Sequence, residues 1–482
     1  MADEQPGIEG KRAPLTLAEA VWLLRARRLS SIELVEGCLR RIEQWEPAIH
    51  ACVTVMSDMA RERARAADEA LRDGHERRAL PGVPVAIKDL IETKGVRTTA
   101  GSRVLADWLP DKDATVVTKL DAAGAIPLCK TNTHEFAFGT VTPPTRNPWN
   151  TAHVPGGSSG GSAAAIATGE SLGALGTDTG GSIRIPAAAC GVTGLKPTFG
   201  LVSRTGIIPL SWSLDHAGPI ARSVEDCALL LDVLAGYDAT DPDSVDVPLL
   251  DFSAALAVNR TPEEAVRGSR IGVPASYFFR HCDAGVEAAV RAALAQLEAL
   301  GATLVEVEIP ATIDEMFEVY RAIQKPEAYT YHRDMGWLDT RAELYRPQVL
   351  ENIRSGASYS AADYVTAQRA RRDFTVRMRE VLRQVDALAT PTLPVPARRV
   401  DEVDTPLLWD GKPEPSGEAL RYTFPFDLTG QPAMTIPCGF TPGRLPVGLQ
   451  VVAAHFGEAT LLRLGHAYQR VTDWHLRVPA LA

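Results

Sequence analysis

Short apolar runs alternate with helical patterns along most of the chain, and this alternation restricts the fold more than any other feature of the sequence. One helical pattern spans Asp283–Leu300 and stops at Gly301, a residue type that commonly ends helices. The alternation predicts an α/β fold, a single large domain in which helices surround a mixed central β-sheet. We expect strands at these runs: Val83–Ile87, Ala125–Cys129, Ser171–Thr177, Arg270–Val273, Thr303–Ile309, Val385–Ala389, Ala433–Pro437 and Val447–Val452.

The beginning of the chain predicts helices. Thr16-x-x-Glu19 and Ser30-x-x-Glu33 both have the capping-box pattern and precede apolar residues at helical spacing. The Ala- and Arg-rich stretch that follows, to about Leu80, predicts a third helix. We expect residues 1–14 to form a flexible tail and residues 15–482 to form the domain.

Composition excludes several classes of protein. The net charge of −10 argues against a nucleic-acid or anionic-membrane partner. Apolar stretches are too short to span a membrane, and the polar, acidic start differs from a signal peptide, so we expect a cytoplasmic protein. Seven cysteines without a CxxC pair do not suggest disulfides or a zinc knuckle. The ten histidines form no HxH or HExxH pattern, so we expect neither a metal nor an organic cofactor.

Two glycine-rich segments that also carry hydroxyl groups, Pro155–Ser162 and Gly176–Arg184, are the most unusual part of the sequence. Glycine permits positive φ and close approach of the backbone to a ligand, and successive exposed N–H groups can bind an oxyanion. Either segment alone could be a flexible surface loop. A phosphate-binding loop is excluded because neither segment ends in Gly-Lys-Ser/Thr.

Two assignments of a nucleophile remain open on these residues. Gly157-x-Ser159-x-Gly161 fits the nucleophile elbow of α/β-hydrolases, in which Ser159 would act with His455 or His466. The other assignment makes Ser182 the nucleophile, with its own Gly-Gly turn as oxyanion hole and a lysine as base.

The chain resembles the amidase signature family, serine hydrolases with a Ser–cis-Ser–Lys triad. The resemblance covers about residues 15–475 and includes a core motif within 82–223. It implies a single α/β domain with a mixed sheet wrapped by helices, in agreement with the alternation above. The matching text is Gly82–Asp89, the PGGSSGGS segment ending at Ser162, Gly176–Thr198, Ser213–Ser223, Gly430-Gln-Pro and Leu445–Gln450.

Aligned on these motifs, Lys88 corresponds to the catalytic lysine, Ser158 to the cis-serine and Ser182 to the acyl-accepting serine. The resemblance also implies a cis peptide bond at Gly157–Ser158 and makes Ser159 a supporting hydroxyl. We expect Asp178 and Arg184 to hold the loop around the nucleophile. The oxyanion hole would use the backbone N–H groups of Thr179, Gly180, Gly181 and Ser182.

Lysine is a poor base in water, but burial lowers its pKa because it disfavours the charged form. The apolar run before Lys88 predicts such burial. Neutral Lys88 could then take a proton from Ser158 while Ser158 takes one from Ser182, and Ser182 would form an acyl-enzyme.

The chemistry expected is hydrolysis of amide C–N bonds in a small-molecule substrate. We expect aryl or alkyl amides, with carbamates and esters also open, and assign substrate selection to a variable region at about 312–360. Candidate pocket residues, which could equally be core residues, are Phe136, Phe138, Trp212, Met316 and Tyr320. We expect no nucleic-acid or membrane partner, and the resemblance allows a homodimer.

The resemblance also includes an alternative, the glutaminase-type A subunit of a tRNA-dependent amidotransferase, which releases ammonia from glutamine. Such subunits hold the charged ends of glutamine with an arginine and an aspartate. Here Ala419–Tyr422, before Thr423, contains no acid, and Arg354 is displaced from the arginine position. The sequence therefore favours a free-standing hydrolase. A non-catalytic binding protein is a third possibility, disfavoured because all three triad residues are present.

Overall fold

The computed structural model describes residues 14–74, 76–256, 258–409, 412–413 and 419–480. Within them, eleven strands form one mixed sheet in the order β1-β3-β2-β4-β6-β5-β12-β13-β9-β7-β8, and β10 pairs separately with β11. The strands are β1 Cys52–Val55, β2 Pro84–Lys88, β3 Ile126–Thr131, β4 Gly173–Asp178, β5 Thr193–Lys196, β6 His216–Ala221, β7 Arg270–Val273, β8 Thr303–Glu306, β9 Ala387–Pro391, β10 Leu408–Trp409, β11 Lys412–Pro413, β12 Ala433–Phe440 and β13 Pro446–Val452.

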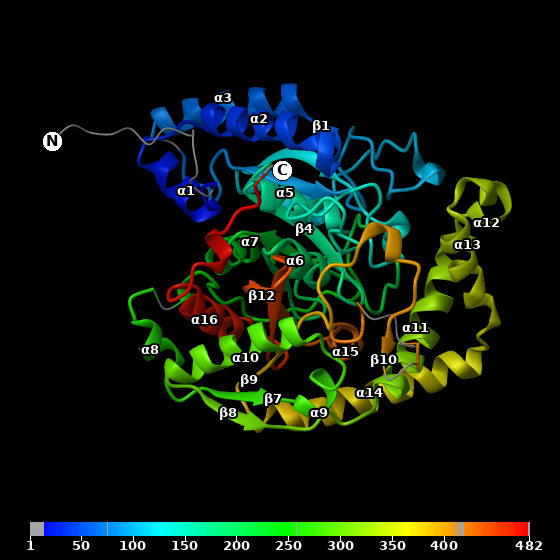
Figure 1. Cartoon of the computed structure of the whole chain (residues 1–482). Coiled ribbons are helices and arrows are strands. Elements are labelled where there is room, and N and C mark those ends of the chain that lie inside the picture. The colour runs from blue at the N-terminus through cyan, green and yellow to red at the C-terminus, as the bar shows by residue number, and fades with distance from the viewer. Residues whose placement is uncertain (1–13, 75, 257, 410–411, 414–418, 481–482) are drawn as a thin grey trace.

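Helices surround this sheet (Figure 1). In that view α2 and α3 lie together at the top, and α11 to α14 occupy the right-hand and lower side. The α-helices are α1 Leu17–Arg25, α2 Ser31–Ile49, α3 Ser57–Arg72, α4 Thr115–Ala122, α5 Gly160–Thr168, α6 Arg184–Cys190, α7 Val224–Leu234, α8 Pro262–Val266, α9 Ala275–Phe278, α10 Ala284–Ala299, α11 Ile313–Asp334, α12 Trp337–Thr340, α13 Pro347–Arg354, α14 Ala361–Leu382, α15 Phe424–Leu428 and α16 Glu458–Gln469.

The predicted fold class is confirmed, because the sheet contains both strand orientations. Strand β2 is parallel to β3 and β4, whereas β4 is antiparallel to β6 and β12 is antiparallel to β13. Each predicted run contributes to a strand. The sequence did not predict β1, β5 or β6. All residues of β5 and β6 are buried, so these strands lack the alternation of apolar and polar residues that marks a half-exposed strand.

The capping boxes predicted at Thr16 and Ser30 are confirmed as the starts of α1 and α2. In each, the hydroxyl accepts the N–H of the glutamate three residues later, and that glutamate accepts the N–H of the capping residue. The third predicted helix is α3. Asp283 caps α10 with its side chain, and that helix ends at Ala299.

Helices α5 and α6 lie inside the fold, since every residue in both is buried. Ala163, Ala164 and Ala167 of α5 pack with Ala187 of α6 in one apolar cluster. Such small side chains allow a helix to approach its neighbours closely. Each helix starts within the last residues of a glycine-rich segment. The two segments are therefore held at the ends of rigid, buried helices.

The expected flexible tail, residues 1–14, lies outside the described residues except for its last position, so the domain boundary at residue 15 remains a prediction. All seven cysteines lie in the described part of the chain and are free thiols. Across those same ranges, no helix combines the length and the apolar character needed to cross a bilayer.

Candidate active site

Lys88 is the last residue of β2, and all five residues of that strand are buried. Its Nζ donates one hydrogen bond to Ser158 Oγ and another to Thr177 Oγ1, both at 2.7 Å. Burial lowers the pKa of Lys88 to about 7, although the carboxylates of Asp178 and Asp215 oppose the shift. The amine can therefore be neutral near neutral pH and accept a proton from Ser158.

The two glycine-rich segments meet at their serines. The Gly157–Ser158 peptide bond is cis, and the backbone N–H of Ser159 donates to the carbonyl of Ser182 at 3.2 Å. Ser158 and Ser159 are fully buried, whereas Ser182 keeps 5% of its surface exposed. Of the three serines, Ser182 is thus the one that a substrate can reach. The proton transfer from Ser182 to Ser158 remains a prediction.

The hydroxyl of Ser159 is hydrogen-bonded to the backbone of β4. Ser159 Oγ donates to the carbonyl of Thr177 at 3.2 Å and accepts the N–H of Thr177 at 3.3 Å. His455, a candidate base for an elbow at Ser159, instead donates from Nε2 to the carbonyl of Thr429. These contacts favour Ser159 as a support for β4 over Ser159 as a nucleophile.

The turn that would form the oxyanion hole is fixed from two sides. Thr179 Oγ1 donates to Asp215 Oδ1 at 2.6 Å, and Thr423 Oγ1 donates to the carbonyl of Gly180 at 2.5 Å. Gly181 adopts φ +136°, and a Cβ atom there would collide with the side chain of Thr423. The turn therefore has one defined backbone conformation, which is a condition for aiming N–H groups at a developing charge.

Asp178 and Arg184 form the centre of a buried polar network. Arg184 Nε and Nη2 donate to the two oxygens of Asp178 at 3.0 Å, Nη2 also donates to the carboxylate of Asp427, and Nη1 donates to Gln450 Oε1. Arg184 holds the pKa of Asp178 well below its usual range. Because Asp178 also accepts the N–H of Ile183 at 3.1 Å, the network anchors the start of α6 just after Ser182.

A cavity of about 360 Å³ opens beside Thr177 and Thr179. Its lining is mostly apolar but carries charges of both signs, since Arg204, Asp215 and Asp241 all border it. Burial raises the pKa of Asp215 to about 6. The lining residues also include Leu90, Ala137, Ile207, Ile208, Pro209, Leu210, Trp212 and Asp243.

The five candidate pocket residues are dispersed. Trp212 lines the cavity and Tyr320 lies against the oxyanion turn, since its hydroxyl would be 2.6 Å from a Cβ placed on Gly180. Phe136 stacks with Trp337 at 5.5 Å in a buried cluster against which Phe138 also packs. Met316 is fully buried in the main core. Four of the five therefore do not line the cavity, and of these four Tyr320 lies against the oxyanion turn.

Four residues of the site were not predicted: Thr177, Asp215, Thr423 and Asp427. Asp215 and Thr177 lie within segments that matched the family. A polar residue inside such a segment could have indicated a role in the site. The contacts of Thr423 and Asp427 link segments more than 200 residues apart in the chain. Such pairings cannot be read from one sequence.

Leu420 and Arg354 lie in the two segments that the resemblance compares with the glutamine-binding residues of amidotransferase A subunits. Leu420 Cδ2 would lie 3.1 Å from a Cβ on Gly180, so an apolar side chain borders the turn. Arg354 lies at the end of α13 and donates weakly to the carbonyl of Leu338 at 3.4 Å. It belongs to the helical region around α12 and not to the lining of the cavity.

The protein-family model described as Amidase matches residues 33–462 of the chain. The A subunit of glutamyl-tRNA(Gln) amidotransferase from Chloroflexus aggregans is 44% identical over 97% of this chain and 98% of its own length. The solved structure of the same-named protein from Thermotoga maritima is 35% identical, with a TM-score of 0.79 and 95% coverage of both chains. A bacterial aryl acylamidase structure is 28% identical, with a TM-score of 0.87, and covers 96% of this chain and 98% of that one.

These similarities correct one expectation. The sequence predicted a small molecule as the sole partner and no nucleic acid. This prediction is wrong, because the relatives share a name that denotes one component of an enzyme that acts on tRNA. Net charge misled because it sums the whole surface and says nothing of a local contact or of a second protein in a complex. The same relatives favour the amidotransferase alternative over the free-standing hydrolase.

Proposed function

The chain belongs to the amidase family, and on that premise we propose that it cleaves a carboxamide C–N bond through a Ser182 acyl-enzyme. We further propose that the amide is the side chain of glutamine and that the protein supplies ammonia as the A subunit of a tRNA-dependent amidotransferase. The observation that carries the chemistry is the 2.7 Å contact between Lys88 Nζ and Ser158 Oγ in a fully buried site. The cytoplasmic location of the protein also remains a prediction.

The reaction starts with neutral Lys88. Lys88 takes the proton of Ser158 while Ser158 takes that of Ser182, and Ser182 Oγ bonds to the carbonyl carbon. The carbonyl oxygen becomes an oxyanion that the N–H groups of the Thr179–Ser182 turn stabilise. The proton returns through Ser158 to the nitrogen, which leaves as ammonia. Water then attacks the acyl-enzyme by the same proton path and frees Ser182.

Two observations support glutamine as the amide. Relatives named as the A subunit match this chain over 97% of its length at 44% identity. The cavity beside Thr179 also contains Asp215, which could face an ammonium group, and Arg204, which pairs with Asp241 and Asp243 and would turn from one of them to a substrate carboxylate. This pair replaces, in our proposal, the arginine and aspartate missing at the family positions.

The test is ammonia release from L-glutamine by the purified chain, with Ser182→Ala as the inactive control. We expect equal amounts of ammonia and glutamate from the wild type and none from Ser182→Ala. The role within a larger enzyme is tested separately by affinity purification from the source cells. We expect a second protein and tRNA to be recovered with the chain. Recovery of the chain alone would contradict that role.

A second candidate function is hydrolysis of less polar substrates: aryl or alkyl amides, carbamates or esters. Leu420 beside Gly180, and Trp212 in a mostly apolar cavity, favour it. The structural similarity to an aryl acylamidase supports it as well. Turnover of anilides or butyramide by a wild type that leaves glutamine intact would select this candidate, whereas the opposite preference would eliminate it.

A further inference from the structure

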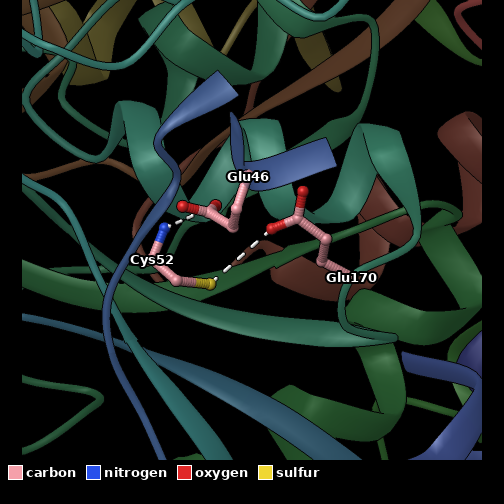
Figure 2. A group of neighbouring side chains, drawn as sticks. All are labelled: Glu46, Cys52 and Glu170. Carbon is pink, nitrogen blue, oxygen red and sulfur yellow. Dashed lines mark hydrogen bonds between the residues drawn. The ribbon is translucent and has the colours of Figure 1, made fainter. Parts of the chain in front are cut away.

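Two carboxylates and two thiols come together between the N-terminal helices and the sheet, in a cluster that the proposed reaction does not use. Glu46 lies on α2, Cys52 begins β1, and Glu170 lies between α5 and β4 (Figure 2). One ligand atom from each of these three residues lies within 4.8 Å of the other two. Cys129 of β3 lies beside this group, with its Sγ 3.1 Å from Cys52 Sγ, and is the candidate for a fourth ligand.

We propose that these four side chains bind one zinc ion. Zinc takes cysteine sulfur at about 2.3 Å and carboxylate oxygen at about 2.0–2.2 Å, most often with four ligands in structural sites. In a tetrahedral site two such ligand atoms are about 3.3–3.8 Å apart, so an ion would draw the three atoms, which lie within 4.8 Å of one another, closer together. Thiolate ligands select zinc over calcium or magnesium, which prefer oxygen alone.

Each carboxyl group has one oxygen held by backbone or hydroxyl donors, and the two groups also share a hydrogen bond whose proton an ion would replace. Glu46 Oε1 accepts the backbone N–H groups of Ala51 at 2.7 Å and Cys52 at 2.8 Å. Glu170 Oε1 accepts the hydroxyl of Thr168 at 3.0 Å, while Oε2 lies 3.6 Å from Cys52 Sγ (Figure 2). Metal-binding carboxylates are typically oriented by such hydrogen bonds.

A cation bound here would have to displace protons from the cluster. Glu170 and Cys129 are fully buried, and burial raises the pKa of Glu170 well above its usual range. The pKa of Cys52 is also raised, first by its contact with Cys129 and then by burial. Arg41 contributes positive charge but donates to the carbonyl of Thr168. A bound dication would stabilise the anionic forms and displace their protons.

The site would join the N-terminal layer to helix α5, which follows Ser158 and Ser159. Gly161, in the first turn of α5, packs so closely on this layer that a Cβ there would lie 2.6 Å from the carbonyl of Ala51. Cys52, one of the proposed ligands, directly follows Ala51. An ion bound here would hold β1 and α2 against α5, which is a structural and not a catalytic role.

The test uses the full chain with a thiol reductant, stripped by a chelator, given Zn²⁺ and desalted. We expect about one zinc per chain by elemental analysis, and a melting temperature that rises with zinc. Cys52→Ser and Glu170→Gln should each weaken zinc affinity by at least about 10- to 100-fold in competition with a chromophoric chelator. Cys438→Ser, a buried cysteine of β12, is the matched control and should retain zinc.

Cobalt binding gives a second readout, a thiolate-to-cobalt absorption band that Cys52→Ser should weaken. Melting of each variant in chelator shows whether it is folded before zinc is added. A wild type that retains no zinc would overturn the proposal, and so would equal retention by the folded Cys52→Ser and Glu170→Gln variants. Loss of two hydrogens from the intact mass without reductant, together with no zinc binding when reduced, would instead identify a Cys52–Cys129 disulfide pair.

Discussion

Lys88 Nζ donates to Ser158 Oγ at 2.7 Å although the two residues are 70 positions apart in the chain. The contact exists because β2 ends at Lys88 and lies beside β4, whose Thr177 fixes both the lysine and Ser159. The same placement buries the amine of Lys88 away from water, and this burial lowers its pKa.

The pH dependence of hydrolysis should follow Lys88. Below about pH 7 the amine is protonated and cannot accept the Ser158 proton, so kcat/KM should fall about tenfold per pH unit and level off above this value. Lys88→Met should lower kcat/KM about 10²- to 10⁴-fold and remove this acid limb. The measurement is a pH–rate profile on one amide substrate.

Lys119→Met is the control for that profile. Lys119 also has a lowered pKa through burial, but it donates to the carbonyls of Leu234, Ala235 and Gly236, away from the serines. Its replacement should reduce stability and leave the acid limb in place. A profile unchanged in Lys88→Met would exclude Lys88 as the base.

Ser182→Ala should abolish covalent labelling by a fluorophosphonate, whereas Ser159→Ala should still be labelled. Ser159→Ala leaves the N–H and carbonyl of Thr177 without a buried hydroxyl partner, so we expect a loss of about 1–3 kcal/mol in the free energy of unfolding. Intact-mass spectrometry and urea denaturation measure the two effects. Labelling that persists in Ser182→Ala and disappears in Ser159→Ala would restore the elbow assignment.

Thr423→Val should lower kcat more than it changes KM, because the Thr423 hydroxyl holds the carbonyl of Gly180 and thereby the oxyanion turn. Loss of one oxyanion donor costs about 10²–10³ in kcat, so misalignment of the turn should cost up to that amount. Thr423→Ser keeps the hydroxyl and should restore most of the rate. Equal losses in both variants would show that the Thr423 hydroxyl does not act through the turn.

The sequence predicted those parts of the fold that local patterns determine. The capping boxes at Thr16 and Ser30 are local patterns. The apolar run before Lys88 is also local, and it predicted the buried strand β2, which ends at Lys88. Strands β5 and β6 were not predicted, because burial on both faces removes the alternation of apolar and polar residues. The proposed zinc cluster was not predicted either, because its four ligands come from separate segments and form no short motif.

Aromatic residues show why the lining of the pocket could not be predicted from the sequence. Phe136 and Trp212 are both near family motifs in the sequence, yet Phe136 is fully buried among other aromatic rings and Trp212 lines the cavity. The side-chain type is the same in core and pocket, and only the tertiary packing separates them.

Arg184→Met should destabilise the protein by about 3–5 kcal/mol, because it leaves the carboxylates of Asp178 and Asp427 buried without their shared cation. Chemical denaturation measures the change. Arg291→Met, which removes a pair with Glu287 on the exposed face of α10, is the control and should cost at most about 1 kcal/mol. Similar costs for the two variants would mean that the Arg184 network does not hold the start of α6.

Leu420→Asp should shift substrate preference toward amides that carry an ammonium group. The Leu420 side chain borders the oxyanion turn at Gly180, where a carboxylate would lie near the reacting amide. An added buried ion pair or charge-assisted hydrogen bond contributes about 1.5–3 kcal/mol, so the ratio of kcat/KM for glutamine to that for butyramide should rise at least about tenfold. Leu420→Asn has the same shape without the charge and should change this ratio much less. If Leu420→Asp and Leu420→Asn alter both substrates equally, then Leu420 does not face the substrate, and selection must come from the Arg204 and Asp215 side of the cavity.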